Sequence, residues 1–398
     1  MICKITKKKI TPFMSFGQMP IANGFLKKKY FKNEFLFKME VGFSREISLF
    51  QLNEHPKPKL MFNKNYPFFT SSSKYMVKHF LDYSKWIKKY YFKNVKNVIE
   101  IGSNDGTFLK NFKSSKTKIL GVEPSKNVAL IANRNKINTI NKFFTYKTAN
   151  SLKKFKNKTD LICAANAICH IPNLKDLIKG IDTLLSKNGV FIFEEPYLGS
   201  MYEKTSYDQI YDEHIFMFSI SSVKKIFNLF NFDLIDVQKQ KTHGGSMRYV
   251  IARKGRYEIK DIVKKNLIYE KKFNIDNLKG CLKFKRNCEK SKRKLRNKIF
   301  LIKKKNKSIA GYAATSKSTT ILNYCGIDNR HIDFICDTTK DKIGKFTPKT
   351  HIPIVNVDHF RKNLPDYTFL FAWNHKDEIF RKEKKILKKT NWIAHINI

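Results

Sequence analysis

Four consecutive residues, Tyr211-Asp-Glu-His214, bring together side chains that can move a proton. Histidine titrates near neutral pH and is the side chain most often used as a general base. A neighbouring carboxylate, from Asp212 or Glu213, could orient the ring of His214 or raise its basicity, and Tyr211 offers a hydroxyl. The aromatic surroundings of this segment fit core packing of His214 equally well, so these residues alone leave both roles open.

A second set of candidate residues follows the short apolar strand expected at Val98-Ile-Glu-Ile101. Small residues at such a strand-to-helix turn let the backbone approach a ligand closely. The acidic residues of the turn suit a cationic ligand better than a pyrophosphate, for which a GxGxxG pattern would be expected. The expected ligand contacts are Glu100, Gly102, Ser103, Asn104, Asp105 and Gly106.

An acidic residue, Glu123, ends the next apolar strand, expected at Lys118-Ile-Leu-Gly-Val122, and is followed by Pro124. It lies about 20 residues after the first glycine of the turn, the separation at which a carboxylate accepts both hydroxyls of a ribose. A ribose joined to a positive centre, without a diphosphate, describes S-adenosylmethionine (SAM). The alternative is an ordinary strand-to-helix turn, with Glu123 as a charge at a helix N-terminus.

Strands and helices alternate around these residues. Further strands are expected at 160–165 and 190–194, and a helix at 174–186, where apolar residues lie three and four apart. This alternation predicts an α/β fold with a parallel, doubly wound sheet. Asn166 and His170 follow the third strand and are therefore expected at the carboxyl end of the sheet, where such folds bind ligands. By itself, His170 also fits a helix-start histidine that the backbone satisfies.

Changes in composition and pattern divide the chain into parts. The expected parts are an N-terminal domain over 1–80, the domain of the doubly wound sheet over 81–256, a basic helical connector over 257–306 and a smaller C-terminal α/β domain over 307–398. The connector is poor in glycine and proline, as a helical segment should be. Strands outside the central domain are expected at 46–52, 308–313, 334–337 and 367–372.

The net charge of 79 − 33 = +46 raises the question of a nucleic-acid partner. The lysines are scattered along the chain together with abundant Asn, Ile and Phe, which is typical of an AT-rich genome, so we expect a solvated lysine-rich surface and no nucleic acid. No apolar run approaches the roughly 18 residues of a membrane span. The N-terminus lacks a signal-peptide core, and the seven cysteines form no CxxC pair, so we expect a cytoplasmic protein with reduced thiols.

Motifs along nearly the whole chain then point to one family. They are, in order, EIGSNDGTFL, GVEPS, NAICHIPNL, YDQIYDEHIFMFS, THGGSMRYVI, GYAATSKSTTILNYCGI, HIPI and AWNHKDEI. In these motifs the chain resembles the class I SAM-dependent C-methyltransferases of nucleotide-linked keto-deoxysugars, of the tetronitrose C-3-methyltransferase type. The resemblance implies a central Rossmann-like SAM domain, a small N-terminal zinc-binding domain, and a C-terminal domain that helps to bind the nucleotide-sugar.

The N-terminal segment departs from this family. It has Cys3 but Lys7 where a second ligand would be expected, and no cysteine in 37–43. A structural zinc site is closed by four ligands, which one cysteine cannot supply, so we expect no zinc. Residues 15–26 still match the family, and the domain is therefore expected to persist on its apolar core.

The resemblance also implies roles for single residues. His214 is the favoured base, and Tyr211, Glu213, His170 and Asn166 line the catalytic pocket, with Asn166 also near the methyl donor. Methylating carbon requires a carbanion equivalent, which a ketone supplies once a base removes its α-proton and a donor holds the enolate oxygen. Asp212 stands where the family usually has histidine.

Substrate contacts are expected at residues outside this group. Lys317 follows a C-terminal strand in a run of small residues that suits a diphosphate at a helix N-terminus. Arg248 is either a phosphate contact or a surface charge. The full set of expected substrate contacts is Tyr66, His243, Arg248, Lys317 and Asn323, with Asn374 as a further candidate.

The predicted function is therefore SAM-dependent methylation of a carbon α to the ketone, C-3 being the expected position, of a nucleotide-linked 4-keto-deoxysugar. Two alternatives remain. One is an N- or O-methyltransferase acting on a related sugar or small metabolite. The other is a basic RNA-binding or assembly protein that keeps a relict SAM fold. The sequence carries no signal for an oligomeric state.

Overall fold

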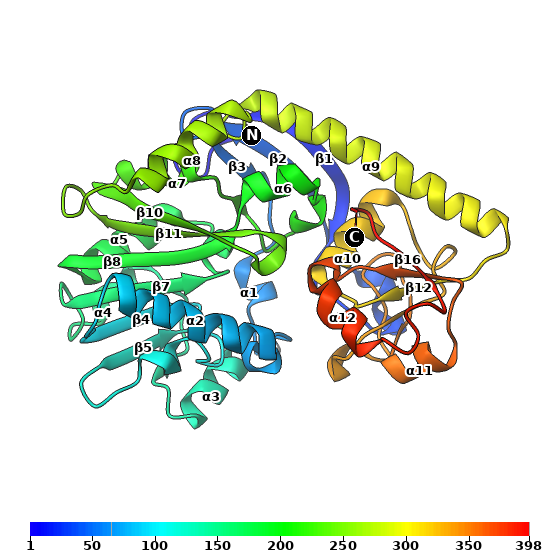
Figure 1. Ribbon diagram of the computed structural model, residues 1–398, viewed down its shortest axis with the longest axis horizontal. Helices are drawn as coiled ribbons and strands as arrows, with labels where there is room; N and C mark the ends of the chain where they lie inside the picture. Colours follow the sequence, from blue (N-terminus) through cyan, green and yellow to red (C-terminus); the bar gives the residue numbers. More distant parts are fainter. Residues whose placement is uncertain (65, 398) are drawn as a thin grey trace.

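The computed structural model describes residues 1–64 and 66–397, and within them the chain forms three β-sheets. In Figure 1 the central sheet lies on one side of the molecule and the C-terminal sheet on the other. The helix α9 (Leu278–Lys304) runs across the top toward the C-terminal side, and α1 (Pro58–Met61) lies between the two halves.

The central sheet has the order β10-β11-β8-β7-β4-β5-β6. Its strands are β4 (Asn97–Ile101), β5 (Lys118–Val122), β6 (Thr139–Ile140), β7 (Thr159–Ala165), β8 (Leu185–Pro196), β10 (Phe232–Gln240) and β11 (Ser246–Arg253). Neighbours from β6 to β8 are parallel, whereas β11 pairs antiparallel with β8 and with β10. The doubly wound α/β fold is thus confirmed, with an antiparallel pair of strands added at one edge.

Helices cover this sheet. They are α2 (Lys74–Tyr90), α3 (Lys126–Arg134), α4 (Tyr146–Ser151), α5 (Leu174–Leu184) and α7 (Ile220–Asn228). The helix α6 (Leu198–Lys204) follows β8 and packs Leu198 and Met201 into the apolar cluster of the N-terminal sheet and α9. The apolar residues of α5 are buried at the helical spacing seen in the sequence, and the Asn173 side chain caps its N-terminus by accepting from the Asp176 amide. The helix ends at Leu184, short of the predicted 186, because Leu185 already belongs to β8.

The N-terminal sheet is antiparallel, with the order β1-β2-β3-β9. Its strands are β1 (Thr11–Pro20), β2 (Leu36–Ser44), β3 (Leu49–Leu52) and β9 (Phe216–Met217). The strand predicted at 46–52 is only partly present, because Ser48, at φ 50°, belongs to the turn before β3. Strand β9 follows the Tyr211–His214 segment directly, so pairing of Phe50 with Met217 joins the N-terminal sheet to the candidate site.

The C-terminal sheet is parallel, with the order β14-β13-β12-β15-β16. Its strands are β12 (Ile309–Tyr312), β13 (Phe334–Cys336), β14 (Ile354–Val355), β15 (Tyr367–Leu370) and β16 (Asn391–Ile393). Its helices are α10 (Ser316–Cys325), α11 (Val357–Lys362) and α12 (Lys376–Lys382). The predicted strands at 308–313, 334–337 and 367–372 are therefore found, each slightly shorter, and β14 and β16 extend the sheet.

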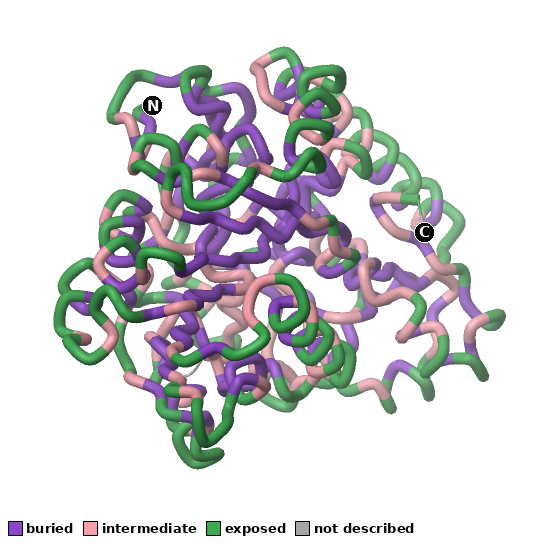
Figure 2. The backbone as a smooth tube through the Cα atoms, turned by 60° about the vertical axis from the view of Figure 1, so that its left-hand side comes forward, coloured by how far each residue is buried: buried purple, intermediate pink, exposed green. Residues whose placement is uncertain are grey.

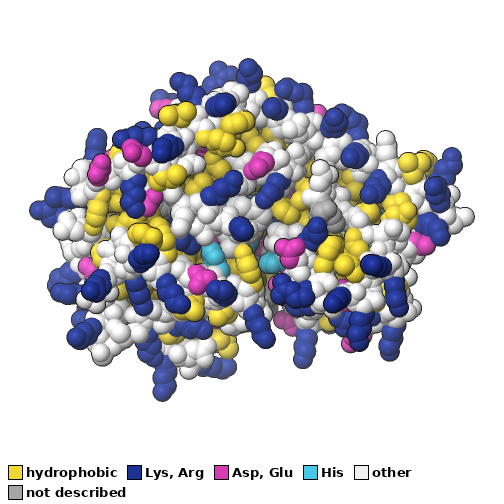
Figure 3. Space-filling model, in the orientation of Figure 1, with side chains coloured by type: hydrophobic (Ala, Val, Ile, Leu, Met, Phe, Trp, Pro, Cys, Tyr) yellow, Lys and Arg dark blue, Asp and Glu magenta, His cyan; other side chains and the backbone are white. Residues whose placement is uncertain are grey.

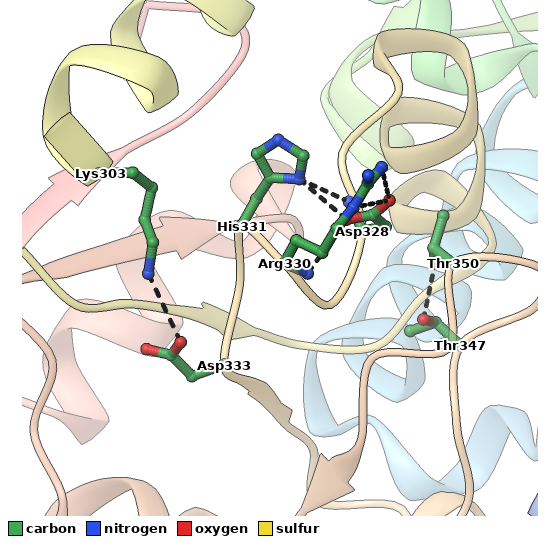
Figure 4. A network of polar contacts seen from close by, with 7 residues as sticks. All are labelled: Lys303, Asp328, Arg330, His331, Asp333, Thr347 and Thr350. Carbon is green, nitrogen blue, oxygen red and sulfur yellow. Dashed lines mark hydrogen bonds and ion pairs between the residues drawn. The ribbon is translucent and has the colours of Figure 1, made fainter.

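The basic segment 257–306 is helical, as expected, but forms two helices, α8 (Asp261–Lys272) and α9. Near its end, Lys303 pairs with Asp333 across 3.7 Å and so ties α9 to the loop before β13 (Figure 4). In the neighbouring turn, Asp328 accepts from Arg330 and lies 2.9 Å from His331, and these contacts lower the pKa of Asp328 to about 2 (Figure 4).

Short 3₁₀ turns complete the chain. They are η1 (Lys28–Asn33), η2 (Thr70–Ser72), η3 (Leu109–Phe112), η4 (Ile168–His170), η5 (Tyr207–Gln209), η6 (Thr242–Gly244), η7 (Lys340–Lys342) and η8 (Trp373–His375). Several of these turns carry candidate site residues, such as His170 in η4 and His243 in η6. The turns lie outside the β-sheets, so side-chain contacts hold them in place.

Buried residues follow the strands, and exposed residues lie on the outer helix faces and loops (Figure 2). One apolar cluster joins the N-terminal sheet, α9 and the C-terminal sheet, through residues such as Phe43, Phe284 and Ile321. Cys3 is fully buried in a second cluster shared with the central sheet. The buried residues of the N-terminal sheet thus belong to clusters that it shares with the other two units.

Lysine and arginine side chains are spread over the whole face drawn in Figure 3 and do not gather over one element. Among the described residues, every helix is too short or too polar to cross a membrane.

Candidate active site

A cavity of about 1320 Å³ lies where the three sheets meet. Its walls come from the carboxyl ends of β4, β5 and β7, from residues 58–64 and 66–73, and from loops of the C-terminal sheet. In Figure 3, histidine side chains are visible at the hollow between the two halves of the molecule. Most of the residues singled out in the sequence line this cavity: Tyr66, Glu100, Gly102, Ser103, Asn104, Glu123, Pro124, Asn166, His170, Tyr211, Glu213, His214, His243 and Lys317.

The turn after β4 forms one half of the cavity. Gly102 has φ +69°, and a side chain there would lie 2.6 Å from the Cβ atom of Ala167, so only glycine fits. The Glu123 carboxylate accepts from the amide of Asn104 at 2.9 Å and from the amide of Ser125 at 2.7 Å. Both contacts fix the turn, and each oxygen keeps a lone pair for another donor.

Three polar atoms in this half of the cavity have no partner within the described part of the chain. They are Oε2 of Glu100, Oγ of Ser103 and Oδ1 of Asn166. Burial raises the pKa of Glu100 well above its ordinary value. Asn166 adopts φ 51°, and its amide donates to the Glu194 carbonyl at 2.8 Å. Buried polar groups are normally hydrogen-bonded, so this half is built for a polar ligand.

His214 holds the centre of the cavity through two hydrogen bonds. Its Nδ1 atom lies 2.7 Å from the carbonyl oxygen of Gln209, and its Nε2 atom lies 2.7 Å from the hydroxyl of Tyr211. A carbonyl can only accept, so Nδ1 carries the proton, and the Nε2 lone pair accepts from Tyr211. Burial is the main cause that lowers the pKa of His214 well below its ordinary value, which keeps the ring neutral.

The prediction that Asp212 or Glu213 orients the ring of His214 is wrong, because both carboxylates bind other partners. Asp212 accepts from the amide of Ala22 at 2.9 Å, and Glu213 accepts from the Asn23 side chain at 2.7 Å. The ring of His214 is oriented by a backbone carbonyl instead, and its pKa is lowered rather than raised. Burial raises the pKa of both carboxyl groups.

His170 stands beside His214, with ring centroids 5.3 Å apart, and its other face stacks on Phe62 at 5.5 Å. Its Nε2 atom is buried without a partner among residues 1–64 and 66–397, and burial lowers the pKa of His170 to about 4. The backbone does not satisfy this atom, as the alternative reading of the sequence would require.

Glu195 positions the turn that carries His170. Its Oε1 atom accepts from the amides of Ala167 at 2.9 Å, Ile168 at 2.7 Å and Cys169 at 3.3 Å. Burial raises the pKa of Glu195 to about 7 despite these bonds. Glu195 is not among the residues predicted from the sequence, although its place at the end of a predicted strand is the same signal that Glu123 gives.

His243 reaches the cavity from a strained turn. His243, Gly244 and Gly245 have φ values of 52°, 85° and 128°, and the Gln209 side chain donates to the carbonyl of His243. A side chain at Gly244 would meet the ring of Trp373 at 2.2 Å. Burial is the main cause that lowers the pKa of His243 to about 3, so this imidazole is neutral too.

The C-terminal sheet forms the other half of the cavity. Thr315 caps α10 by accepting from the Ser318 amide, which places Lys317 in the first turn of the helix. The Lys317 ammonium lies 3.2 Å from Oδ1 of Asn374. At the end of β13, Asp337 accepts from the amides of Ala314 at 2.8 Å and Thr339 at 2.7 Å, much as Glu123 does in the central sheet.

Arg248 does not line the cavity, and both roles considered for it are wrong. It is buried, donates to Glu194 at 2.9 Å and to Gln238 at 2.6 Å, and lies 3.5 Å above the ring centroid of Tyr83. The ion pair and His79 help to lower the pKa of Glu194 to about 2. Arg248 is thus a structural partner of Glu194, which a single sequence cannot reveal.

Three further predicted residues lie behind the cavity wall. The Asp105 carboxylate accepts from the amide of Ser71 at 2.8 Å and thereby anchors the 66–73 segment. Gly106, at φ +78°, turns the backbone against Ile137. Asn323 donates to the carbonyls of Thr319 and Pro348.

The segments that form both halves of the cavity are similar to known proteins. Residues 76–237 match the family described as Methyltransferase domain, and residues 241–396 match the family described as C-methyltransferase C-terminal domain. The C-methyltransferase NovU of Streptomyces niveus is 28% identical over 378 residues, which cover 94% of this chain and 90% of NovU. The chain is a SAM-dependent C-methyltransferase.

Solved structures align with about half of this methyltransferase. A protein of Pyrococcus horikoshii OT3 aligns with a TM-score of 0.39 and 16% identity, over 47% of this chain and 95% of its own. Magnesium protoporphyrin IX methyltransferase from Synechocystis PCC 6803, solved with bound SAM, aligns with a TM-score of 0.34 and 11% identity, over 44% of this chain and 79% of its own.

The cofactor of the methyltransferase is SAM, and the residues at the end of the central sheet fit it. The Glu123 carboxylate at the end of β5 is an acceptor of the kind that binds ribose hydroxyls in such folds, and the bare backbone at Gly102 leaves room for close approach. Among the described residues, the side-chain oxygens of Glu100 and Asn166 named above lack partners, which fits a ligand with polar groups.

Proposed function

We propose that this methyltransferase transfers the methyl group of SAM to a carbon α to the ketone of a nucleotide-linked 4-keto-deoxysugar, with C-3 as the expected position. The observation that carries this proposal is the hydrogen-bonded chain from Tyr211 through His214 to the carbonyl of Gln209 at the cavity. It supplies a neutral base and a hydroxyl donor side by side, which are the two groups that enolisation of a ketone requires.

The order of proton movements follows from this chain. The hydroxyl of Tyr211 donates to the Nε2 lone pair of His214, which is therefore not available as a base while this hydrogen bond is made. In the proposal, the ketone oxygen of the sugar accepts this hydroxyl proton, and the freed Nε2 atom then removes the α-proton. The carbonyl of Gln209 holds the Nδ1 proton throughout and stabilises the imidazolium that forms.

Bound SAM supplies an electrophilic methyl group on a sulfonium. Asn166 and His170 line the same cavity as His214, and each has a buried polar atom without a partner among the described residues. In the proposal they orient the sugar ring so that the α-carbon faces the cofactor. Neutral His170 can also donate to the enolate oxygen without adding a positive charge that would quench the base.

The nucleotide diphosphate is proposed to lie on the C-terminal half. Lys317, Lys340, Lys342 and Lys382 line the cavity there, and Lys317 projects from the first turn of α10. Ammonium groups and helix N-termini both favour phosphate oxygens. The Asp337 carboxylate, which resembles Glu123 in its backbone contacts, is a candidate acceptor for the hydroxyls of the nucleotide's sugar.

Methyl transfer tests the proposal directly. The enzyme is incubated with SAM carrying a carbon-13 methyl group and with TDP-, GDP- and UDP-linked 4-keto-6-deoxyhexoses in deuterated buffer, and carbon NMR is recorded. A new C–CH₃ signal with loss of the α-proton is the expected result. An O- or N-methyl shift would contradict carbon as the acceptor, and the absence of both transfer and α-deuteration on every sugar would overturn the sugar class.

A further inference from the structure

We infer that Asn23, a residue of the N-terminal sheet domain, is a positioning residue of the active site: its amide fixes the Glu213 carboxylate and locks it to the first turn of α10. The inference deepens the proposed function, because Glu213 belongs to the proposed catalytic pocket. It assigns a role to a domain whose metal ligands are absent from the sequence, and to a residue that no sequence motif singled out for chemistry.

Asn23 lies at the cavity wall, in the loop that follows β1. Its Nδ2 atom donates to Oε1 of Glu213 at 2.7 Å, and its Oδ1 atom accepts from the Ser316 hydroxyl at 3.0 Å. The two ends of the amide are chemically different, so the carboxylate on one side and the hydroxyl on the other define its orientation. One side chain thus joins all three sheet-bearing units at the cavity.

The neighbouring residue repeats this bridge with its backbone. The amide of Ala22 donates to Oδ1 of Asp212 at 2.9 Å, and its carbonyl accepts from the hydroxyl of Thr319 at 2.8 Å. Residues 22 and 23 therefore bind the acidic pair on one side and α10 on the other. The loop is thus tied to both sides by several contacts, and the bond of Ala22 to Asp212 and the bond of Asn23 to Ser316 remain when the Thr319 contact is removed.

Glu213 depends on this amide. Within the described residues, Asn23 provides its hydrogen bond. The other titratable groups that face Glu213 are Asp212 on its own segment, Tyr211, Tyr66 from the segment before α2, and Cys169 from η4. None of these is a cation, so the amide donor of Asn23 is what favours the ionised carboxylate against burial and against Asp212.

The test uses the full-length enzyme and needs no sugar. Glutamate labelled with carbon-13 at the side-chain carboxyl is incorporated, and the signal of Glu213 is identified by its loss in Glu213→Gln. Its titration is followed in the wild type, in Asn23→Leu, which has the same branching but no donor, and in Asn23→Asp, which is close in size to asparagine. Thr319→Val is the matched control, because it cuts the tie of the same loop to α10 but leaves the amide of Asn23 in place.

Loss of a hydrogen bond to a charged group is expected to raise the Glu213 midpoint by about one pH unit in Asn23→Leu. In Asn23→Asp the added carboxylate should raise the midpoint further. In Thr319→Val the midpoint should stay at the wild-type value. A midpoint that stays unchanged in both Asn23 variants, or that moves as far in Thr319→Val, would overturn the inference. Because the readout is the ionisation of Glu213, it decides this question even if the sugar class proposed above proves wrong.

A kinetic arm follows if a sugar is turned over. The Asn23 variants should then lower kcat about tenfold and shift the pH profile upward, with the KM for SAM unchanged, whereas Thr319→Val should keep the wild-type profile. An equal loss of kcat in all three variants, without a shift of the profile, would show a merely structural role and would contradict the inference.

Discussion

The hydroxyl of Tyr211 lies 2.7 Å from the Nε2 atom of His214 and donates its proton to the lone pair that a general base must use. The ring cannot turn away, because its Nδ1 proton is held by the carbonyl of Gln209 at 2.7 Å. The hydroxyl of Tyr211 therefore covers the Nε2 lone pair of His214. In the proposed reaction the ketone oxygen accepts the hydroxyl proton and uncovers this lone pair, so the same contact would couple ketone recognition to deprotonation.

Replacing Tyr211 with phenylalanine should uncover the base but remove the donor for the ketone oxygen. We expect methyl transfer to fall roughly 10²-fold, the loss typical of one donor to a developing oxyanion. Alkylation of His214 in the free enzyme, followed by mass spectrometry, should become faster. Tyr146→Phe, at an exposed position, is the control. Unchanged turnover in Tyr211→Phe would contradict the coupling.

Removing the base itself should have a larger effect. His214→Ala is expected to lower methyl transfer by about 10²- to 10⁴-fold, because general base catalysis contributes that much. Binding of SAM should be retained, since the contacts proposed for it come from the turn after β4 and from Glu123. The measurements are carbon NMR of the product and equilibrium dialysis with labelled SAM. Near-wild-type transfer would exclude His214 as the base.

Arg248→Met should destabilise the fold rather than weaken substrate binding. The variant keeps the apolar contact with Tyr83 but leaves the buried Glu194 without its guanidinium partner, a change that costs about 3–5 kcal/mol. The free energy of unfolding, from urea titration, should fall by that amount. In the exposed control Arg256→Met it should hardly change. A stable variant with a raised KM for the sugar nucleotide would restore the phosphate-contact role.

Lys317→Met should show which ligand each half of the cavity binds. A hydrogen bond to a charged group contributes about 1.5–3 kcal/mol, so the KM for the nucleotide-sugar should rise roughly 10- to 100-fold. The affinity for SAM should stay the same, because Lys317 belongs to the C-terminal half. Lys298→Met on the exposed side of α9 provides the comparison. If SAM binding weakened instead, the assignment of the two halves would have to be reversed.

The acidic pair Asp212 and Glu213 should make stability depend on pH. Burial raises the pKa of both in the folded enzyme, so their contribution to stability is fully present below the unfolded pKa of about 4 and is lost as the pH rises through the raised values. The free energy of unfolding should therefore decline between about pH 5 and about pH 8. The difference between the wild type and the double variant Asp212→Asn, Glu213→Gln isolates this effect.

The buried histidines act in the opposite direction. Lowered pKa values at His170 and His243, about 4 and about 3, add stability that is present above the ordinary value and is lost as the pH falls. They are the same in the wild type and in the double variant, so they cancel in the difference. A difference that does not vary with pH would contradict the raised pKa of the acidic pair.

Much of the fold was predictable because its signals are local. The strand at 118–122 has the predicted bounds, and the segment predicted to be helical over 257–306 forms two helices within 261–304. The antiparallel edge of the central sheet was not predicted, because β10 and β11 pair through contacts that periodicity does not encode. Strand β9 is two residues long and owes its existence to β3.

The candidate site divides in the same way. Residues in recognisable motifs, such as Glu123 and His214, line the cavity as expected. Residues that work through partners distant in sequence were missed or misassigned. Glu195 accepts hydrogen bonds from a turn that lies 26 to 28 residues earlier in the chain. Arg248 pairs with Glu194, 54 residues away, and Asn23 donates to Glu213, 190 residues away.

The sequence by itself thus determined the fold class, the cofactor and the identity of the candidate base, because strand-helix periodicity and short motifs depend on neighbours in the chain. Only the tertiary structure decided which atom of His214 carries the proton, which partner each carboxylate binds and which charges are buried. These properties arise where β9, the turns η4 to η6 and the loop of Asn23 meet, since desolvation and hydrogen-bond geometry depend on groups that folding alone brings together.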